Sequence, residues 1–259
     1  METILLVAFL FLKTGEKFAT QEMAGQTVGE FTAVVAKAVG GIEFEAQVMN
    51  DPVKAVEFCM LKKPPVGIVT PGFYVAYAKA LEMEPLLEVR RQKVAAERYV
   101  VVVKKTTTEG LDAVRGKVLA TSLAAEERYV TGVILQDKVA ELRMKPVRDI
   151  EGAVFDLVEG AKEAAEAVLM EEAVWQVMEK DEELGPQLKV AYRSEELPGA
   201  LVVAFRGDMK AAKIKDAMKS LNKTEEGRQS LASILVETFE DVNQVRLKKA
   251  QESLMGRLQ

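Results

Sequence analysis

Histidine is absent from this sequence, and cysteine occurs once, at Cys59. Because histidine is the commonest general base and zinc ligand, histidine-based triads and Cys/His zinc sites are excluded. Cys59 lies beside Phe58 and Met60 in a helical-looking run, where a thiol is expected to be buried as a small apolar group. No paired acids and no nucleophile motif mark a catalytic centre. We therefore expect no enzyme, no catalytic residue, no metal site and no cofactor.

Four polar side chains follow apolar runs that have the character of buried strands. Lys13 and Thr14 begin the loop after the first run, and Thr70 and Tyr74 follow a later one. Open α/β sheets bind ligands at the carboxyl ends of their strands, and loops there carry function more often than their share. All four are therefore candidate ligand-binding residues, although Thr70 also suits the role of a helix cap.

Charge and hydropathy limit the partners of this 259-residue chain. Its net charge of -5 comes from interspersed acidic and basic residues, without a basic stripe that could neutralise a phosphate backbone. No apolar run approaches the roughly 20 residues that span a bilayer. The apolar run at 3–11 lacks the basic start and cleavage site of a signal peptide, so we expect a first core strand there. Nucleic acid and membrane insertion are not expected.

Apolar runs bounded by turns alternate with amphipathic helical patterns, which indicates α/β sheets covered by helices. After a polar loop at 13–26, the spacing of Thr27 and Glu30 predicts a capping box and a helix whose buried face includes Val28, Phe31 and Val35. The other predicted elements of the first half are a helix from Asp51-Pro52 to about Lys62, a strand at 66–69, a helix from Thr70 to Ala80, and a strand at 98–103.

A second α/β unit is predicted between the strand at 98–103 and another at 200–205. Its expected elements are strands at 117–122, 166–170 and 187–192, and helices at about 126–137, 151–159 and around Trp175. The segment 208–259 is expected to form two or three amphipathic helices that pack on the first lobe, with a break at 222–224 and, in the case of three helices, a second break at 239–241. Each lobe is thus expected to be a mixed, mostly parallel sheet flanked by helices, with two crossings that make a hinge.

Four stretches carry a resemblance to a known family. In order and spacing the chain resembles the type 2 periplasmic binding proteins, and among them the phosphate, phosphite and phosphonate-binding component of ABC importers. The stretches are Val66-Gly-Ile-Val-Thr-Pro-Gly-Phe-Tyr-Val-Ala-Tyr-Ala78, Leu111-Asp-Ala-Val-Arg-Gly-Lys-Val-Leu-Ala120, Ala153-Val-Phe-Asp-Leu-Val-Glu-Gly-Ala-Lys-Glu-Ala-Ala165 and Ser194-Glu-Glu-Leu-Pro-Gly-Ala-Leu-Val-Val203. Most of their residues would also serve packing in any α/β protein.

The resemblance implies a two-lobed solute-binding protein that closes over a small polar, anionic or zwitterionic ligand between its lobes. Lobe 1 would be residues 1–103 with 202–259, and lobe 2 the inserted residues 104–201. It further implies an ABC transporter permease as partner, a monomer, and a periplasmic or other extracytoplasmic location, with a membrane anchor if a lipoprotein signal precedes the chain. Hinge closure would then be the mechanism.

In phosphonate-binding relatives, a Ser/Thr run after the first strand of the second lobe opens a helix and holds the anion. The matching stretch here contains Thr121 and Ser122, but then reads Glu126-Glu127-Arg128-Tyr129. Two carboxylates in a first helical turn would repel a doubly charged phosphonate. The resemblance therefore assigns Thr121, Ser122, Glu126, Arg128 and Tyr129 to the ligand, but leaves the ligand's identity open.

Two more candidates rest on the resemblance. The family's histidine before the helix at 153 is replaced here by Val147-Arg148, so Arg148 together with Arg128 could restore an anion site; surface salt bridges are the alternative. Glu171 follows the strand at 166–170, where relatives that bind aminophosphonates keep an acidic residue for the amine. For Glu171 and its neighbour Glu172, a solvated helix start is the alternative.

Two other functions stay open on the sequence. The first is a ligand-sensing or orphan binding module, in which the cleft biases a partner instead of supplying a transporter. The second is an enzyme on the same fold, which would need a carboxylate or a lysine as its general base.

Overall fold

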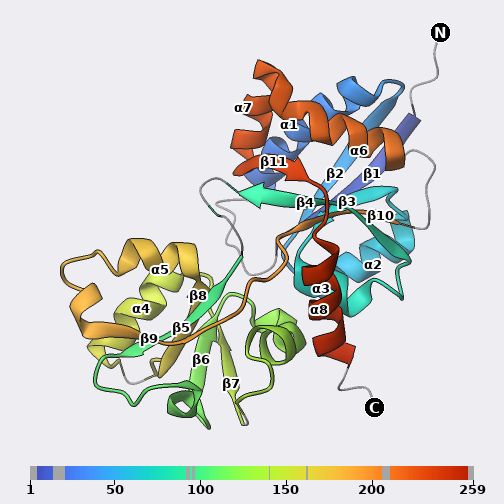
Figure 1. Ribbon diagram of the computed structural model, residues 1–259. Helices are drawn as coiled ribbons and strands as arrows, with labels where there is room; N and C mark the ends of the chain where they lie inside the picture. The colour runs from blue at the N-terminus through green and yellow to red at the C-terminus, as the bar shows by residue number, and fades with distance from the viewer. Residues whose placement is uncertain are drawn as a thin grey trace. The chain divides into compact units, whose positions relative to one another are not determined.

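The computed structural model describes residues 5–13, 21–91, 94, 97–139, 141–161, 163–205 and 211–255. It divides into two compact units, each with its own sheet (Figure 1). Unit 1 comprises the described residues up to 94 together with 198–247, and unit 2 comprises 97–197 and 248–255. No described helix is long and apolar enough to cross a bilayer.

Unit 1 is built on a six-stranded sheet with the order β11-β4-β10-β3-β1-β2. β2 and β3 run parallel to β1, whereas β10 is antiparallel to β3 and β4, and β11 is antiparallel to β4. Since parallel β1 and β3 end at the same edge, the residues after them lie at one edge of the sheet. The strands are β1 (Leu5–Leu12), β2 (Ile42–Met49), β3 (Val66–Val69), β4 (Met83–Arg91), β10 (Leu201–Phe205) and β11 (Val236–Glu240).

Helices cover both faces of this sheet because successive side chains of its strands point to opposite faces. In β1, Phe9 belongs to a core formed with α1 (Gln21–Val39), α6 (Ala211–Ser220) and α7 (Glu225–Ser233). Its neighbour Leu10 belongs to a second core, formed with α2 (Pro52–Lys62) and α3 (Pro71–Tyr77). A short turn, η5 (Leu221–Lys223), joins α6 to α7.

Unit 2 is built on a five-stranded sheet with the order β7-β6-β8-β5-β9. β6 is parallel to β7 and β8, so the three strands end at the same edge, while β5 is antiparallel to β8 and β9. Figure 1 shows α4 (Ile150–Glu159) and α5 (Glu172–Met178) lying beside this sheet, and their apolar faces pack on it around Val154 and Trp175. The strands are β5 (Tyr99–Lys104), β6 (Val118–Thr121), β7 (Arg143–Pro146), β8 (Ala167–Glu171) and β9 (Leu188–Arg193), with short 3-10 turns at η1 (Leu111–Val114), η2 (Ala124–Glu126) and η4 (Gly185–Gln187).

The last helix, α8 (Gln244–Met255), passes from one unit to the other along the chain. Leu247 is buried in the core of unit 1. From residue 248 the helix belongs to unit 2, where Lys249 forms an ion pair with Glu195 and Leu254 approaches Gly132. The expected crossings were near Val103 and Leu201; β5, which contains Val103, pairs within the sheet of unit 2, and the return occurs at 197–198.

Helices were expected from Asp51-Pro52, Thr70 and Glu151, and the structure has them with Asp51, Thr70 and Asp149 as N-caps. The predicted capping box at Thr27 is wrong, because α1 begins at Gln21 and Thr27 lies inside it. The strands β2, β4, β7 and β11 were not predicted, and the end of β11 overlaps the expected break at 239–241.

The sheets are also less parallel than expected. Among the described strands, four neighbouring pairs are parallel and five antiparallel. The reason is that β5 and β10, the first strands after the two crossings, each run antiparallel to both of their neighbours.

The helix expected at 126–137 is replaced by η2 and a π-helical turn, η3 (Tyr129–Ile134). Its β-branched residues Val130, Thr131, Val133 and Ile134, together with Gly132, are weak helix formers. In addition, the Thr131 hydroxyl donates to the carbonyl of Glu127 at 3.0 Å, a side-chain bond that competes with regular helix geometry.

Candidate functional site

The carboxyl edge of the sheet of unit 2 gathers most of the predicted ligand-binding residues. Thr121 ends β6, Arg148 follows β7 and Glu171 ends β8, and these three parallel neighbours finish at the same edge. The Val147 amide donates to the Thr121 carbonyl at 3.1 Å, which joins the two loops directly after the strands. The sheet topology therefore brings Thr121, Arg148 and Glu171 to one edge.

The end of β6 and the segment after it contain five of the predicted residues. Thr121 is buried, and its hydroxyl accepts from the Leu123 amide at 3.1 Å, so it shapes the turn that leads into η2. Glu126 and Tyr129 are also buried, whereas Ser122 is half-buried and Arg128 is exposed. Tyr129 begins the π-helical turn η3, a conformation frequently found at functional sites.

The start of α4 shows why a simple anion site is disfavoured here. Asp149, which was not predicted, is the N-cap, and its carboxylate accepts from the Gly152 amide at 3.0 Å. That carboxylate occupies a helix N-terminus that would otherwise attract an anion. Arg148, one residue earlier, is exposed, and no ion pair of its side chain is found within the described part of the chain. An Asp preceding a helical pattern was the sequence signal that could have identified this cap.

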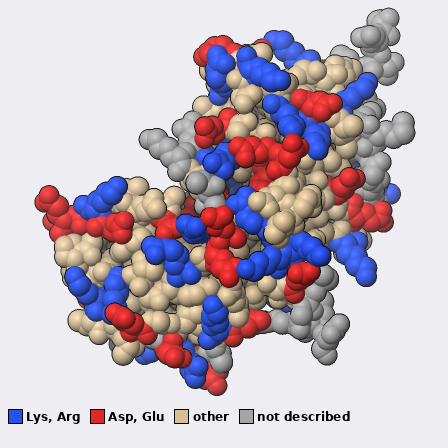
Figure 2. All heavy atoms as spheres, in the orientation of Figure 1, with Lys and Arg blue, Asp and Glu red and all other residues tan. Residues whose placement is uncertain are grey.

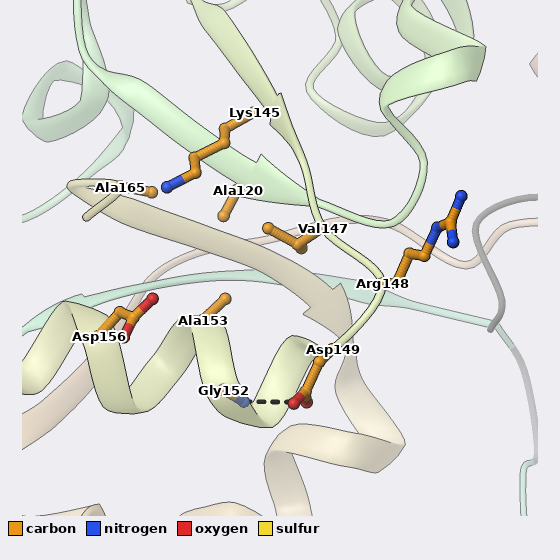
Figure 3. A pocket seen from close by; sticks show the side chains of 9 residues that line it. All are labelled: Ala120, Lys145, Val147, Arg148, Asp149, Gly152, Ala153, Asp156 and Ala165. Carbon is orange, nitrogen blue, oxygen red and sulfur yellow. Dashed lines mark hydrogen bonds between the residues drawn. The ribbon is translucent and has the colours of Figure 1, made fainter. Parts of the chain in front are cut away.

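A pocket of about 440 Å³ lies in unit 2 beside α4 (Figure 3). Arg148 and Asp149 line one end of it, and Lys145 and Asp156 line the other. Between them the wall is formed by small apolar side chains, namely Ala120, Ala153, Ala165 and Val147. The guanidinium of Arg148 is turned away from Lys145 and Asp156.

Unit 1 holds the remaining predicted residues. Lys13 directly follows β1 and Thr70 directly follows β3, so the parallel pairing of these strands places both at one edge. The Thr70 hydroxyl accepts from the Phe73 amide at 3.2 Å, so Thr70 is a helix cap. Tyr74 is buried in the apolar core around Phe73. Thr14 lies outside the described residues.

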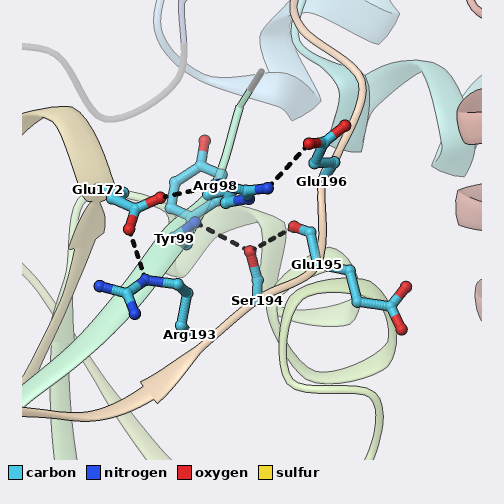
Figure 4. Close-up of polar contacts among 7 residues, drawn as sticks. All are labelled: Arg98, Tyr99, Glu172, Arg193, Ser194, Glu195 and Glu196. Atoms are coloured by element: carbon cyan, nitrogen blue, oxygen red, sulfur yellow. Dashed lines mark hydrogen bonds and ion pairs between the residues drawn. The ribbon is translucent and has the colours of Figure 1, made fainter. Parts of the chain in front are cut away.

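Besides α8, two segments link the units along the chain: an outgoing segment before Glu97 and a return segment around 197–198. Neither was predicted as a polar centre, but hydrogen bonds hold the return segment at both of its ends. In unit 2, the Leu197 amide donates to the Glu97 carbonyl at 2.8 Å, so the outgoing and return segments pair with each other. Arg98 binds Glu196 at 2.8 Å and approaches Glu172 at 3.8 Å, while Arg193 binds Glu172 at 2.5 Å (Figure 4).

In unit 1, the return segment is held by a buried carboxylate. Glu88 of β4 accepts from the amides of Gly199 at 2.9 Å and Asn243 at 3.1 Å, and from the Arg246 guanidinium at 3.4 Å. Gly199 approaches the sheet so closely that a Cβ atom there would lie 2.9 Å from the Val89 carbonyl oxygen. The glycine of the Leu-Pro-Gly turn at 197–199 therefore allows the return segment to lie close against β4.

Several other charged groups form ion pairs. Among the described residues, no group of three or more side chains could hold a metal ion. Hydrogen bonding to Lys117 lowers the pKa of Glu166, and hydrogen bonding to Lys249 lowers the pKa of Glu195. Acidic and basic side chains are interspersed over the face seen in Figure 2.

Comparisons with solved structures support the two-lobed α/β fold. XAC2383 from Xanthomonas citri, bound to ATP in the structure compared, has a TM-score of 0.74 at 12% identity, with 98% of both chains covered. A binding-protein component of an ABC phosphonate transporter from Pseudomonas aeruginosa has a TM-score of 0.70 at 11% identity, with 98% of this chain and 87% of that chain covered.

PhnD1 from Prochlorococcus marinus, in complex with methylphosphonate, has a TM-score of 0.68 at 14% identity, with 100% of this chain and 99% of that chain covered. No curated protein sequence matches the chain. The family described as "ABC transporter, phosphonate, periplasmic substrate-binding protein" matches residues 18–246. The chain belongs to this family of periplasmic substrate-binding proteins of phosphonate ABC transporters and is a solute-binding protein.

Proposed function

We propose that this protein captures a small organic acid that also carries an amine, and supplies it to an ABC importer. The observation that carries the proposal is the mixed charge at the carboxyl edge of unit 2. Exposed Arg148 lies there with Glu171 and with an α4 N-terminus already capped by Asp149, and the loop after β6 adds Glu126 and exposed Arg128.

A doubly charged simple phosphonate fits this edge poorly. A helix N-terminus attracts an anion through its unpaired amides and its dipole, and a capping carboxylate uses both. A ligand with one acidic group and one ammonium group can instead pair its acid with an arginine and its ammonium with a carboxylate. In the proposal Arg128 and Arg148 bind the acid, Glu171 and Glu126 bind the amine, and Thr121, Ser122 and Tyr129 complete the site.

Unit 1 would contribute Lys13, Thr14, Thr70 and Tyr74, as the sequence suggested. The segments that link the units would act as the hinge, because only a few residues there need to change their backbone angles. The family implies a small-molecule ligand, a transporter partner and an extracytoplasmic location. We further propose that the binding protein works as a monomer, which light scattering coupled to size-exclusion chromatography would test.

Isothermal titration calorimetry of the full chain would test the ligand class. The panel comprises methylphosphonate, inorganic phosphate, 2-aminoethylphosphonate and L-glutamate. We expect 2-aminoethylphosphonate to bind most tightly, and Arg148→Ala to weaken it by at least about tenfold, since a charge-assisted hydrogen bond contributes about 1.5–3 kcal/mol. Arg115→Ala is the matched control, because Arg115 is an exposed arginine of the same unit paired only with Asp112 among the described residues.

Two results would overturn this proposal. One is tighter binding of methylphosphonate or phosphate than of the amine-bearing compounds. The other is unchanged affinity for every bound compound in both Arg148→Ala and Arg128→Ala. If no compound of the panel binds, a sensing or orphan role with another ligand replaces it.

A further inference from the structure

The pocket beside α4 exists because small side chains meet there. Ala120 of β6, Ala153 of α4 and Ala165, which precedes β8, are all buried. α4 packs mainly against β8, with further contacts to β5 and β6, and the edge strand β7 borders the space beside it. The pocket's volume of about 440 Å³ falls within the roughly 300–1,000 Å³ that is usual for small-molecule sites.

The strand register places Lys145 on the face of the sheet that borders this pocket. Lys145 pairs with Ala120 across β7 and β6, and residues directly opposite each other in neighbouring strands share a face of the sheet. The long side chain of Lys145 then reaches the carbonyl of Glu163, to which its Nζ donates at 2.7 Å. One of three ammonium donors is used in this bond, which leaves two for a guest.

Two carboxylates line the pocket from α4, on the wall that faces β7. Asp156 projects from α4 toward the space that Lys145 enters from β7, and Asp149 lies at the other end of the same helix face (Figure 3). Lys145 and Asp156 form no ion pair with each other or with other described residues. The pocket therefore presents unlike charges on facing walls, separated by an apolar floor.

We propose that this pocket is a second binding site, for a small aliphatic amino acid whose carboxylate binds Lys145 and whose ammonium binds Asp156. A guest that carries only a negative charge leaves Asp156 and Asp149 without a cationic partner. A guest that carries only a positive charge is repelled by Lys145. A zwitterion satisfies both walls, and its methylene groups cover the alanines. This inference does not rest on the proposed transport function, because it depends on Lys145 and Asp156, to which that function assigns no role.

The site can be located by NMR of the full chain with 13C-labelled alanine methyl groups. The probes are glycine, β-alanine and 4-aminobutyrate, with propionate and propylamine as singly charged analogues. We expect at least one zwitterion to shift the methyl signals of Ala120, Ala153 and Ala165. Propionate and propylamine should bind at least about tenfold more weakly, as expected when a charged group is left unpaired.

Two variants test the charged walls, and each has a control of the same chemical change. Lys145→Met and Asp156→Asn should each weaken the zwitterion by at least about tenfold. Lys180→Met and Glu159→Gln alter exposed residues of the same unit outside the pocket and should leave its affinity unchanged. Thermal unfolding of each variant shows whether it is folded.

The proposal is wrong if no zwitterion at 10 mM shifts the three methyl signals, or if folded Lys145→Met and Asp156→Asn bind as the wild type does. In the second case Lys145 only protects the edge strand β7 from pairing with another sheet. If Arg148→Ala alone abolishes binding of these probes, they occupy the edge of the sheet, and the pocket is not their site. Loss of 2-aminoethylphosphonate binding in Arg148→Ala with intact amino-acid binding would separate the two proposals.

Discussion

The return segment is anchored in two different ways at its two ends. In unit 1 a single buried carboxylate, Glu88, gathers two backbone amides and a guanidinium. In unit 2 the anchor is a set of partly exposed ion pairs around Glu172, with Arg98 40% and Arg193 52% exposed. A buried carboxylate cannot be replaced by water when it is removed, whereas exposed charges can be resolvated. The end in unit 1 should therefore be rigid and the end in unit 2 adaptable.

The largest effect is expected from Glu88→Ala. It leaves the amides of Gly199 and Asn243 and the guanidinium of Arg246 without this acceptor, which should lower the free energy of unfolding by about 3 kcal/mol. Urea denaturation followed by circular dichroism measures it. Glu84→Ala, an exposed glutamate of the same strand, should change stability by less than about 0.5 kcal/mol. Equal effects of the two substitutions would contradict the difference between the anchors.

Gly199→Ala should be next in size. The added Cβ would lie 2.9 Å from the backbone oxygen of Val89, so strand β4 or the return segment must shift, at a cost of about 1–3 kcal/mol. The control is Gly29→Ala, inside α1, where a Cβ meets nothing within 4 Å and should stabilise the helix slightly. Chemical denaturation of the two variants should give shifts of opposite sign; a stable Gly199→Ala would show that the close approach is unimportant.

Ser194→Ala tests the neutral part of the anchor in unit 2. The Ser194 hydroxyl accepts from the Tyr99 amide at 2.9 Å in a buried position, and its loss should cost about 1 kcal/mol (Figure 4). Hydrogen exchange of the Tyr99 amide should accelerate in the same variant. Ser253→Ala, whose hydroxyl donates to the Lys249 carbonyl within α8, provides the comparison and should leave that amide unchanged.

Arg98→Met should have a smaller effect still, below about 1 kcal/mol. Its side chain is 40% exposed, and surface ion pairs contribute little because water and salt screen them. Whatever difference exists at low salt should disappear in 1 M NaCl, as measured by thermal unfolding. A salt-independent loss as large as that of Glu88→Ala would remove the contrast between the two ends.

The smallest effect concerns protonation. Hydrogen bonding to Lys249 holds the pKa of Glu195 below its usual value. This pair therefore stabilises unit 2 at pH values above the pKa that Glu195 has in the unfolded chain. The stabilisation is lost as the pH falls through the lower pKa that Glu195 has in the folded protein. Lys249→Met should return the Glu195 pKa toward its ordinary range in an NMR titration. Glu225, whose pKa is lowered by Arg228, should titrate as before; a shift at both sites would mean that the substitution disturbs the whole fold.

Local signals in the sequence predicted much of the architecture. Asp51 and Thr70 mark helix starts because a cap and its amides lie within three residues of each other. The strand β2 was missed because it is an edge strand with Glu43 and Glu45 in its alternating pattern, and lacks the continuous apolar run of β3.

The sites were harder to predict than the elements. Thr121, Arg148 and Glu171 could be placed at one edge from strand order alone. The role of Glu88 depends on partners 111 and 155 residues away, which no local pattern reveals. The pocket depends on three alanines from separate elements, and an alanine in a sequence is indistinguishable from ordinary packing.

The place of β10 in the sheet of unit 1 has a consequence for the order of folding. β10 lies between β3 and β4, yet it is synthesised after all of residues 97–197. While the chain emerges, unit 1 therefore has a sheet with an open middle, and its two halves can be joined only after the inserted unit has left the ribosome. Pairing of strands so far apart in sequence is slow, because the chain loses conformational entropy when distant segments meet, before the contacts between them can stabilise the fold. We expect unit 2, whose sheet comes from one continuous stretch, to be the first to acquire protection during synthesis.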